Sequence, residues 1–486
     1  MSETLQLKKL DEDENMILGL LLDQLDKKAK RNFLRACYYD GKYALTRSMT
    51  PVPPEYFKIG IVLGWSAKAV DILARRCNLD GFVWTDGDLA TLGLDTVLDE
   101  NNFASVSNSA ITSSLIHSCS FLINTEGDTG EPKSLIHVKD ALNATGEWNA
   151  RTRQLDNLLS ITGRGERGGD AAAVTSFALY LDGLTITADW DKSGEWQVER
   201  QPHKWGVPAE VVAYQPREDG RPFGSSRISR AVMSLHRAAL RTVTRMEAHA
   251  DIYSFKDLLI LGADESVFKN ADGSQKTVWQ VMMGRINGIP DDDEATNPRA
   301  EVHEIAAETP QPHLDMLKQQ AQLFSGETSI PLTSLGVSDM SNPTSADSYI
   351  ASREDLIAEA EGATDDWARP FRRSMIRALA IQNGIGMDEV PAKWSSIDTK
   401  WRSPVYLSRA AQADAGMKQI TAVPWLAETS VGLELLGLTD QQIRQALSER
   451  RRASASIALS DRLAGRTAAA DANPAAAPGQ GPAAAQ

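Results

Sequence analysis

The stretch whose spacing is most suggestive of chemistry is Gly163-Arg-Gly-Glu-Arg-Gly168, which fits the pattern G-x-G-x-x-G. In a dinucleotide-binding protein such a loop follows a strand and opens a helix, so that the backbone can approach a pyrophosphate. Here the residues after Asp170 alternate as in a strand, and Arg164 and Arg167 are typical of an exposed hairpin tip. The sequence therefore favours a hairpin over a nucleotide site. No Gly-Lys-Ser/Thr ending of a Walker A motif occurs.

The other reactive side chains are dispersed. The seven histidines do not form the H-x-x-x-H or H-E-x-x-H spacing of metal sites. We expect His236 and His249, on the basic side of a long helix, to be solvated or hydrogen-bonded. No G-x-S-x-G nucleophile motif occurs, and adjacent acids such as Asp365 and Asp366 are typical of solvated charge. The sequence predicts no catalytic residue, no metal site and no cofactor.

Composition bounds the class of protein. With 486 residues, 42% hydrophobic and 24% charged, the chain is typical of a soluble protein with two to four structural units. We find no run of 18 apolar residues and no basic secretory signal, so we expect no membrane span and a cytosol-like compartment. Cys37, Cys77 and Cys119 form no C-x-x-C pair, so buried free thiols are expected rather than disulfides or zinc ligands.

The net charge of −14 excludes proteins that bind duplex DNA through their whole surface, such as transcription factors or packaging histones. Sequence-independent affinity for DNA comes from clustered Lys and Arg. An acidic chain is compatible with letting DNA slide past, and equally with having no DNA role.

The first half of the chain predicts an α+β structure. Helices are expected near 14–40, 66–76 and 92–110, and a short strand at 81–84. Further strands are expected at 114–124, 135–138, 155–162, 173–181, 184–189, 195–200 and 211–214.

A long helix is predicted after Pro222, capped by Ser225 or Ser226 and running to about Tyr253. Its apolar residues recur at three- and four-residue steps over seven turns and include Val232, Leu235 and Met246. The opposite face carries Arg230, Arg237, Arg241 and Arg245. The apolar stripe must pack against its own chain or a neighbouring copy. The arginines either form ion pairs with a neighbouring helix or subunit or contact phosphates, and the first use is the more common.

Later segments are mostly helical. A short strand is expected at 257–261, helices at 310–324 and 345–382, and a non-helical stretch at 326–343 between them. Pro370 should kink or break the third helix. Helices are expected again within 405–463, and the Ala- and Pro-rich residues from 464 onward should be disordered.

Two stretches carry a resemblance to a known family. One is Gly220-Arg-Pro-Phe-Gly-Ser-Ser-Arg-Ile-Ser-Arg230, which runs into the long helix and on to Leu258-Leu-Ile-Leu-Gly262. The other is Asn342-Pro-Thr-Ser-Ala-Asp-Ser348. They resemble the portal proteins of tailed phages, of siphophage type, and are most similar to portals of phages that infect actinobacteria. The resemblance extends in order over residues 10–460.

The resemblance implies an α+β, mainly helical portal fold with a β-containing wing, long stem helices, a small α/β clip and a helical crown. It divides the chain into wing (1–224), outer stem helix (225–253), clip (254–308), channel-lining stem helix (309–326), tunnel loop (327–344), second wing part (345–404) and crown (405–463). The disordered tail (464–486) is predicted from composition and has no counterpart in the resemblance.

The function implied by the resemblance is that of a ring, usually of twelve subunits, at one capsid vertex of the virion. Double-stranded DNA would pass through it without sequence specificity during packaging and ejection. Implied partners are the large terminase subunit, a head-completion adaptor protein, the major capsid protein and scaffold, with assembly in the host cytoplasm and no membrane.

Two sets of residues are expected to carry this function. The tunnel-loop residues expected to face DNA are Ile330, Pro331, Leu332, Thr333, Ser334, Leu335 and Val337. Residues 327–344 contain no Lys or Arg, as suits a lining that does not bind phosphates. The clip residues expected to face terminase or adaptor are Trp279, Met282, Met283, Asp291, Asp292 and Asp293.

Two other functions are compatible with parts of the sequence: a helical scaffold or coat-type protein without a DNA channel, and an enzyme with a nucleotide site at Gly163–Gly168. A scaffold would not need the order helix, small α/β insert, helix, loop and kinked helix. That order favours the portal interpretation.

Overall fold

The computed structural model describes most of the chain in two compact units, Met1–Pro404 and Val405–Gln486. The unit boundary coincides with the boundary that the resemblance places before residue 405. The described residues are 5–43, 60–167, 170–191, 193–253, 257–261, 269–270, 272–275, 301–305, 309–337, 353–406 and 409–471.

The first unit begins with helices that precede its sheets. Helix α1 spans Glu12–Tyr39 and α2 spans Trp65–Ala74, as expected. The single helix expected at 92–110 is instead three pieces, which are η2 (Leu89–Leu92), α3 (Leu94–Glu100) and α4 (Phe103–His117). Left-handed backbone at Gly93 and Asn102 separates them, because such a conformation ends a right-handed helix.

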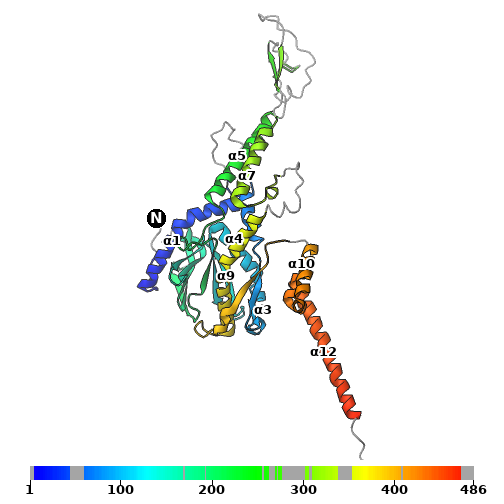
Figure 1. The fold of residues 1–486 in the computed structure, drawn as a ribbon. Helices are drawn as coiled ribbons and strands as arrows, with labels where there is room; N and C mark the ends of the chain where they lie inside the picture. Colours follow the sequence, from blue (N-terminus) through cyan, green and yellow to red (C-terminus); the bar gives the residue numbers. More distant parts are fainter. Residues whose placement is uncertain are drawn as a thin grey trace, which may run out of the picture. The chain divides into compact units, whose positions relative to one another are not determined.

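The strands form antiparallel sheets (Figure 1). One has the order β3-β2-β9 and another the order β4-β5-β6-β7-β8, while β1 pairs with β12. Their bounds are β1 Leu79–Trp84, β2 Cys119–Glu126, β3 Ser134–Asp140, β4 Ala144–Asn149, β5 Gln154–Arg167, β6 Asp170–Leu181, β7 Leu184–Trp190, β8 Trp196–Pro202, β9 Ala209–Ala213 and β12 Ile397–Trp401. The α+β class is confirmed.

Two details of the predicted strands were wrong. Strand β2 begins at Cys119 rather than at 114, because α4 continues to His117 and ends at a left-handed Ser118. Strand β4 was not predicted, because its sequence Ala-Thr-Gly-Glu-Trp-Asn is poor in β-branched residues.

Helix α9 (Glu354–Asn383) is the centre of the largest core in the first unit. Its side chains Trp367, Phe371 and Met375 are fully buried, and it contacts strands β2 and β9. The helix continues through Pro370, so the break expected there is absent. Burial on this scale outweighs the hydrogen bond that a proline removes. The 3-10 helix η5 (Ala392–Ser396) then leads into β12.

Helices α5 (Arg230–Tyr253) and α7 (Gln311–Thr328) run side by side (Figure 1). Between them in the sequence lie β10 (Asp257–Leu261) and β11 (Glu301–Ile305), which pair antiparallel. Strand β11 was not predicted. After α7 the chain forms the 3-10 helix η4 (Leu332–Leu335).

The second unit is helical. It contains α10 (Arg409–Ala422), η6 (Pro424–Glu428), α11 (Ser430–Leu435) and α12 (Asp440–Asp471). Helix α12 includes residues 464–471, which were predicted to be disordered, because alanine is the strongest helix former. Residues 472–486 lie outside the described part.

Candidate functional site at the α5–α7 helix pair

The start of α5 is set by Ser229. Its Oγ accepts a hydrogen bond from the N–H of Val232 (3.1 Å), so Ser229 is the cap and the prediction of Ser225 or Ser226 was wrong. Ser226 is buried instead, and its hydroxyl donates to the carbonyl of Ile116 (2.6 Å). The segment before α5 is thereby bound to the end of α4.

One side of α5 packs against the rest of the first unit. Val232 and Ala239 are buried, whereas Leu235 and Met246 are half-buried. His236 is hydrogen-bonded, which is one of the two roles expected for it: its Nδ1 lies 2.8 Å from Ser66 Oγ. It is buried, so its expected place on the basic side of the helix was wrong. Its ring meets the Tyr38 ring edge-on, and burial lowers the pKa of His236 to about 4.

The exposed charged side chains of α5 are three arginines and two acids, Glu247 and Asp251. Arg230, Arg237 and Arg241 are exposed and Arg245 is half-buried. Within the part of the chain that the structure describes, no ion pair joins the exposed three to an acid. Arg237 Nε donates instead to the carbonyl of Met233 in its own helix (3.4 Å).

Helix α7 presents a different outer surface. Ala321, Phe324 and Thr328 are buried against the first unit. The exposed charged side chains of α7 are both acidic, Asp315 and Glu327, whereas Lys318 is half-buried. The remaining exposed side chains of α7 are neutral: Gln311, Pro312, Leu314, Met316, Gln319, Gln322 and Leu323.

The two helices are joined by side chains at their interface. Gln320 Nε2 donates to Thr242 Oγ1 (3.0 Å), and Thr242 is fully buried. At the far end of the pair the rings of His249 and His313 lie 5.2 Å apart. The pair is therefore one packed unit along its length.

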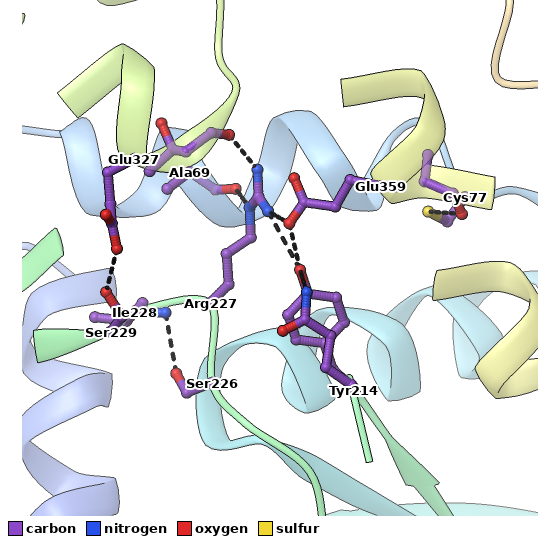
Figure 2. Close-up of polar contacts among 12 residues, drawn as sticks. Ala69, Cys77, Tyr214, Ser226, Arg227, Ile228, Ser229, Glu327 and Glu359 are labelled. Carbon is purple, nitrogen blue, oxygen red and sulfur yellow. Dashed lines mark hydrogen bonds and ion pairs between the residues drawn. The ribbon is translucent and has the colours of Figure 1, made fainter. Parts of the chain in front are cut away.

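The base of the pair is organised by Arg227, which is 6% exposed (Figure 2). Its Nε donates to the carbonyl of Ala69 in α2 (2.5 Å), and its Nη2 donates to the carbonyl of Thr328 at the end of α7 (2.6 Å). Its Nη1 forms an ion pair with Glu359 of α9 and contacts the Tyr214 hydroxyl (3.4 Å). We call these five residues the root.

The root also holds a buried tyrosine. The Tyr214 hydroxyl donates to Glu359. Burial raises the pKa of Tyr214 well above its usual value; the positive charge of Arg227 opposes this rise and the negative charge of Glu359 adds to it. Outside the five root residues, Ser229 Oγ donates to Glu327 (3.2 Å), which links the first turn of α5 to the last turn of α7 (Figure 2). The start of α5, the end of α7, α2 and α9 thus meet at one guanidinium group.

The residues expected to line a channel have mixed surroundings. Ile330, Pro331 and Leu335 are buried, and Ile330 and Leu335 belong to the core of the first unit. Leu332, Ser334 and Val337 are half-buried, and Thr333 is exposed. The carbonyl of Ser334 accepts a hydrogen bond from Lys68 Nζ (2.6 Å). This segment is thus attached to its own subunit up to Val337, and residues 338–344 lie outside the described part.

Other predicted residues are not brought to this site. The clip candidates Trp279, Met282, Met283, Asp291, Asp292 and Asp293 lie outside the described residues. Gly163 to Arg167 belong to β5, which pairs with β6, so the helix that a dinucleotide loop requires is replaced by a strand. Cys37, Cys77 and Cys119 are free thiols, of which Cys37 is only half-buried.

The described residues hold neither a candidate metal cluster nor a membrane-spanning helix. There, no three His, Cys, Asp or Glu side chains gather closely enough to hold a metal ion. None of the helices that the structure describes has the length and apolar character needed to cross a bilayer.

Sequence reasoning missed Arg227, Tyr214 and Glu359. Arg227 lies inside the Gly220–Arg230 stretch that carries the family resemblance, which was a usable signal. Nothing in the local sequence indicates that Glu359, 132 residues later, is its partner.

Comparison with known proteins decides the family. The model described as "Phage portal protein, SPP1 Gp6-like" matches residues 18–455. The chain belongs to this family of phage portal proteins. The resemblance inferred from the two sequence stretches is thus confirmed, and the family is structural rather than enzymatic.

Individual relatives agree with the assignment. The portal protein of Mycobacterium phage L5 is 23% identical over 415 residues, which are 84% of this chain and 82% of that protein. The portal protein of Mycobacterium phage D29 is 24% identical over 392 residues, 78% of this chain and 77% of that protein.

Solved structures share a distant likeness. A chain from the virion of a native gene transfer agent particle is 12% identical, with a TM-score of 0.40. The match covers 77% of this chain and 90% of that chain. A chain from the neck of that particle, computed with C12 symmetry, is 13% identical at a TM-score of 0.40, with the same coverage. The family assignment does not depend on these two.

Proposed function

We propose that this portal protein forms a ring, of twelve subunits, at one capsid vertex, and that double-stranded DNA passes through the ring during packaging and ejection. In this proposal α5 is the outer stem helix and α7 lines the channel. The large terminase subunit, a head-completion adaptor, the major capsid protein and scaffold are its partners during assembly in the host cytoplasm.

The observation that carries the proposal is the charge difference between the two helices. The exposed surface of α7 has two acids and no exposed Lys or Arg, whereas α5 exposes three arginines together with the acids Glu247 and Asp251. A channel wall that passes DNA should not bind phosphates, because each Lys or Arg contact adds salt-dependent affinity. The arginines of α5 suit the opposite role, ion pairs with an acidic neighbouring copy in a head-to-tail ring.

The root supports the same proposal mechanically. A helix pair that surrounds moving DNA must hold its position relative to the rest of its subunit. Arg227 ties both helices to α2 and α9 by charge-assisted hydrogen bonds, and its buried position protects these bonds from water.

The ring is tested by negative-stain microscopy of the purified full-length chain. Annular particles with a central hole are expected. Monomers that persist at every concentration, together with the absence of the protein from a ring on virions, contradict the proposal.

The channel assignment is tested by adding one positive charge to each helix. Gln322 of α7 and Ser234 of α5 are both exposed, so Gln322→Arg and Ser234→Arg are matched variants. Both should form rings. We expect Gln322→Arg to lower the amount of DNA packaged, more strongly at low salt, because one new phosphate contact forms. Equal packaging by both variants at low salt would show that α7 does not face the DNA.

A further inference from the structure

One side of helix α1 is apolar at its beginning and cationic towards its end. At steps of three and four residues, which place side chains on the same side of a helix, this side carries Ile17, Leu21, Gln24, Lys28, Arg31 and Arg35. In the middle, Gln24 Nε2 donates to Thr145 Oγ1 in β4 (2.6 Å). This side of α1 is thus held beside the edge of the five-stranded sheet.

The three cations on this side have no acidic partner. Among the residues that the structure describes, no ion pair joins Lys28, Arg31 or Arg35 to an acid. Lys28 Nζ lies over the Phe223 ring (5.4 Å from its centroid), and Arg35 Nη1 donates to the carbonyl of His117 (3.2 Å). Arg35 Nε is buried and forms no hydrogen bond. The positive charges of Lys28, Arg31 and Arg35 are therefore left without a counter-ion in the subunit.

The cations also repel one another. Burial, with the charge of Arg31 as the next cause, lowers the pKa of Arg35 to about 10. Burial also lowers the pKa of Lys28; Cys119 opposes this shift and the charge of Arg31 adds to it. Partly buried charges of one sign destabilise a free subunit, and an anion placed among them removes that repulsion.

The apolar end of the same side borders a hollow between α1 and β4. Its volume is about 410 Å³, and Leu20 at its rim is 59% exposed. The acids that border it already have partners: Asp23 pairs with Lys27 (2.5 Å), and Glu147 accepts a hydrogen bond from Asn157 (2.8 Å). The hollow is lined by Ile17, Leu20, Leu21, Asp23, Gln24, Lys27, Lys28 and Glu147. Lys28 therefore belongs both to the hollow and to the cations.

The combination of hollow and cations indicates the kind of partner. Unpaired Lys and Arg complement carboxylates or phosphates, whereas an apolar hollow complements a bulky side chain. A DNA backbone offers only the phosphates, but a protein segment with acidic and apolar residues offers both groups. The chain's own second unit is a poor source of such a segment, because residues 405–486 carry eight Lys or Arg and seven Asp or Glu.

The spacing of the two ends defines the segment further. From Leu21 to Lys28 the helix rises about 10 Å. Three residues of an extended chain span the same length, about 10 Å. A bulky apolar residue followed three positions later by acids therefore reaches both ends of the surface.

We propose that this side of α1 binds an extended acidic segment of another protein, with one apolar side chain in the hollow and carboxylates at Lys28, Arg31 and Arg35. The proposal goes beyond the ring and its channel. Binding is expected of the free subunit and so does not depend on assembly.

Fluorescence anisotropy of the purified full-length chain tests this, with the fluorescein-labelled peptide Gly-Ser-Leu-Ser-Ser-Asp-Asp-Ser-Gly as the probe. We expect a dissociation constant of roughly 10–100 μM at low salt. Replacing Leu by Ser, or both Asp by Asn, should each weaken binding about fivefold or more, and salt of about 0.5 M should also weaken it. No binding, or equal binding of the altered peptides, would overturn the proposal.

A matched set of charge variants tests the cations. Lys28→Gln combined with Arg31→Gln, which we call the cation variant, should weaken peptide binding about tenfold or more. Lys30 is exposed on the other side of α1, because two helical residues turn the chain by about 200°. Lys30→Gln should therefore change the affinity less than twofold. The cation variant should also resist guanidinium at least as well as the unaltered chain, because repulsion is removed. Unchanged peptide affinity for the cation variant would overturn the proposal.

The hollow is tested by two equally exposed apolar residues. Leu20 and Met16 are both 59% exposed, but Met16 is not among the residues that line the hollow. Leu20→Ser should weaken peptide binding about fivefold, whereas Met16→Ser should change it less than twofold. Equal effects of the two substitutions would contradict the placement of the apolar side chain.

Two other outcomes would give the surface to a different occupant. If the peptide does not bind and the cation variant lowers ring yield, a second copy covers the surface. If a short DNA duplex binds in place of the peptide and the cation variant abolishes that binding, the cations are a phosphate site. Both outcomes overturn the proposal and leave the ring function intact. Peptide binding by a chain that never forms rings would support the proposal and refute the ring.

Discussion

Two buried arginines bind α9 to the rest of the first unit, and they do so differently. At the root, Arg227 bonds to two backbone carbonyls and to Glu359, and its partners come from four separate parts of the chain. In what we call the platform, Arg377 of α9 pairs with Glu210 of β9 (2.8 Å) and donates to the carbonyl of Trp205 (3.3 Å).

The difference lies in how replaceable each arginine is. In the platform, Arg373 also pairs with Glu210 (3.3 Å), so that carboxylate keeps a cation if Arg377 is lost. At the root, within the described part of the chain, Glu359 forms an ion pair with Arg227 and with no second cation. The platform is held by a shared network, whereas the position of the helix pair depends on one guanidinium group.

The largest effect is expected from Arg227→Ala. It would leave Glu359 and two carbonyls without their partner and should cost about 3–5 kcal/mol of unfolding free energy. Equilibrium guanidinium denaturation of the subunit measures this. Arg227→Lys is the control for charge, and it should recover part of the loss because the ammonium cannot reach all four partners. A loss below about 1 kcal/mol for Arg227→Ala would remove the distinction between root and platform.

The second largest effect is expected from acid, which should destabilise the region beside the root. Burial holds the pKa of His236 at about 4, so the folded state keeps the ring neutral, whereas the unfolded chain takes up a proton near pH 6.5. The contribution of neutral His236 to the free energy of unfolding should therefore be fully present above pH 6.5. The free energy of unfolding should fall by roughly 2–3 kcal/mol as the pH drops from 6.5 to 4.

Denaturation midpoints measured across this range test the acid effect. His236→Gln, which retains a group able to bond Ser66, should flatten that part of the profile. The comparison is His203, whose pKa is also lowered by burial and by the charge of Arg377. His203→Gln should leave the His236 contribution in place. An unchanged profile for His236→Gln would contradict the assignment.

Arg377→Ala should have a smaller effect than Arg227→Ala. Because Arg373 still pairs with Glu210, we expect a loss of about 2 kcal/mol, mainly from the bond to Trp205 and from lost packing. Adding Arg373→Ala should bring a further, more than additive loss, as Glu210 then has no cation. Strictly additive losses would mean that the two arginines do not share the carboxylate.

The smallest effects are expected from two serines. Ser229→Ala removes the cap of α5, and Ser374→Ala removes a hydrogen bond to Asn124 in the platform (3.0 Å). Each should cost about 1 kcal/mol by denaturation. They should differ in hydrogen exchange: Ser229→Ala should increase exchange in the first turn of α5, whereas Ser374→Ala should leave that turn unchanged.

Much of the fold could be predicted from periodicity. Helices α1, α2, α5 and α7 and most strands were found because their apolar residues repeat at 3.6 or 2 residues over long stretches. The errors fall where the local signal competes with tertiary packing. Pro370 was expected to kink or break α9, yet the helix continues through it, with Trp367, Pro370 and Phe371 all buried.

The site was predicted less completely. The arginine face of α5 could be recognised because its residues follow one helix, and three of the four arginines are exposed as expected. The apolar residues after α7 were expected to line the channel and face DNA, but within the subunit Ile330 and Leu335 are in the core. A short apolar stretch without periodicity does not indicate which side of it will be buried.

The sequence alone determined the family, the α+β class and the long amphipathic helices, because each is encoded by residues close together in the chain. The tertiary structure alone decided that Arg227 meets Glu359, that His236 faces Ser66 and that the exposed charges of α5 and α7 differ. These depend on contacts between residues more than 100 positions apart, and on which side of each helix the rest of the subunit covers.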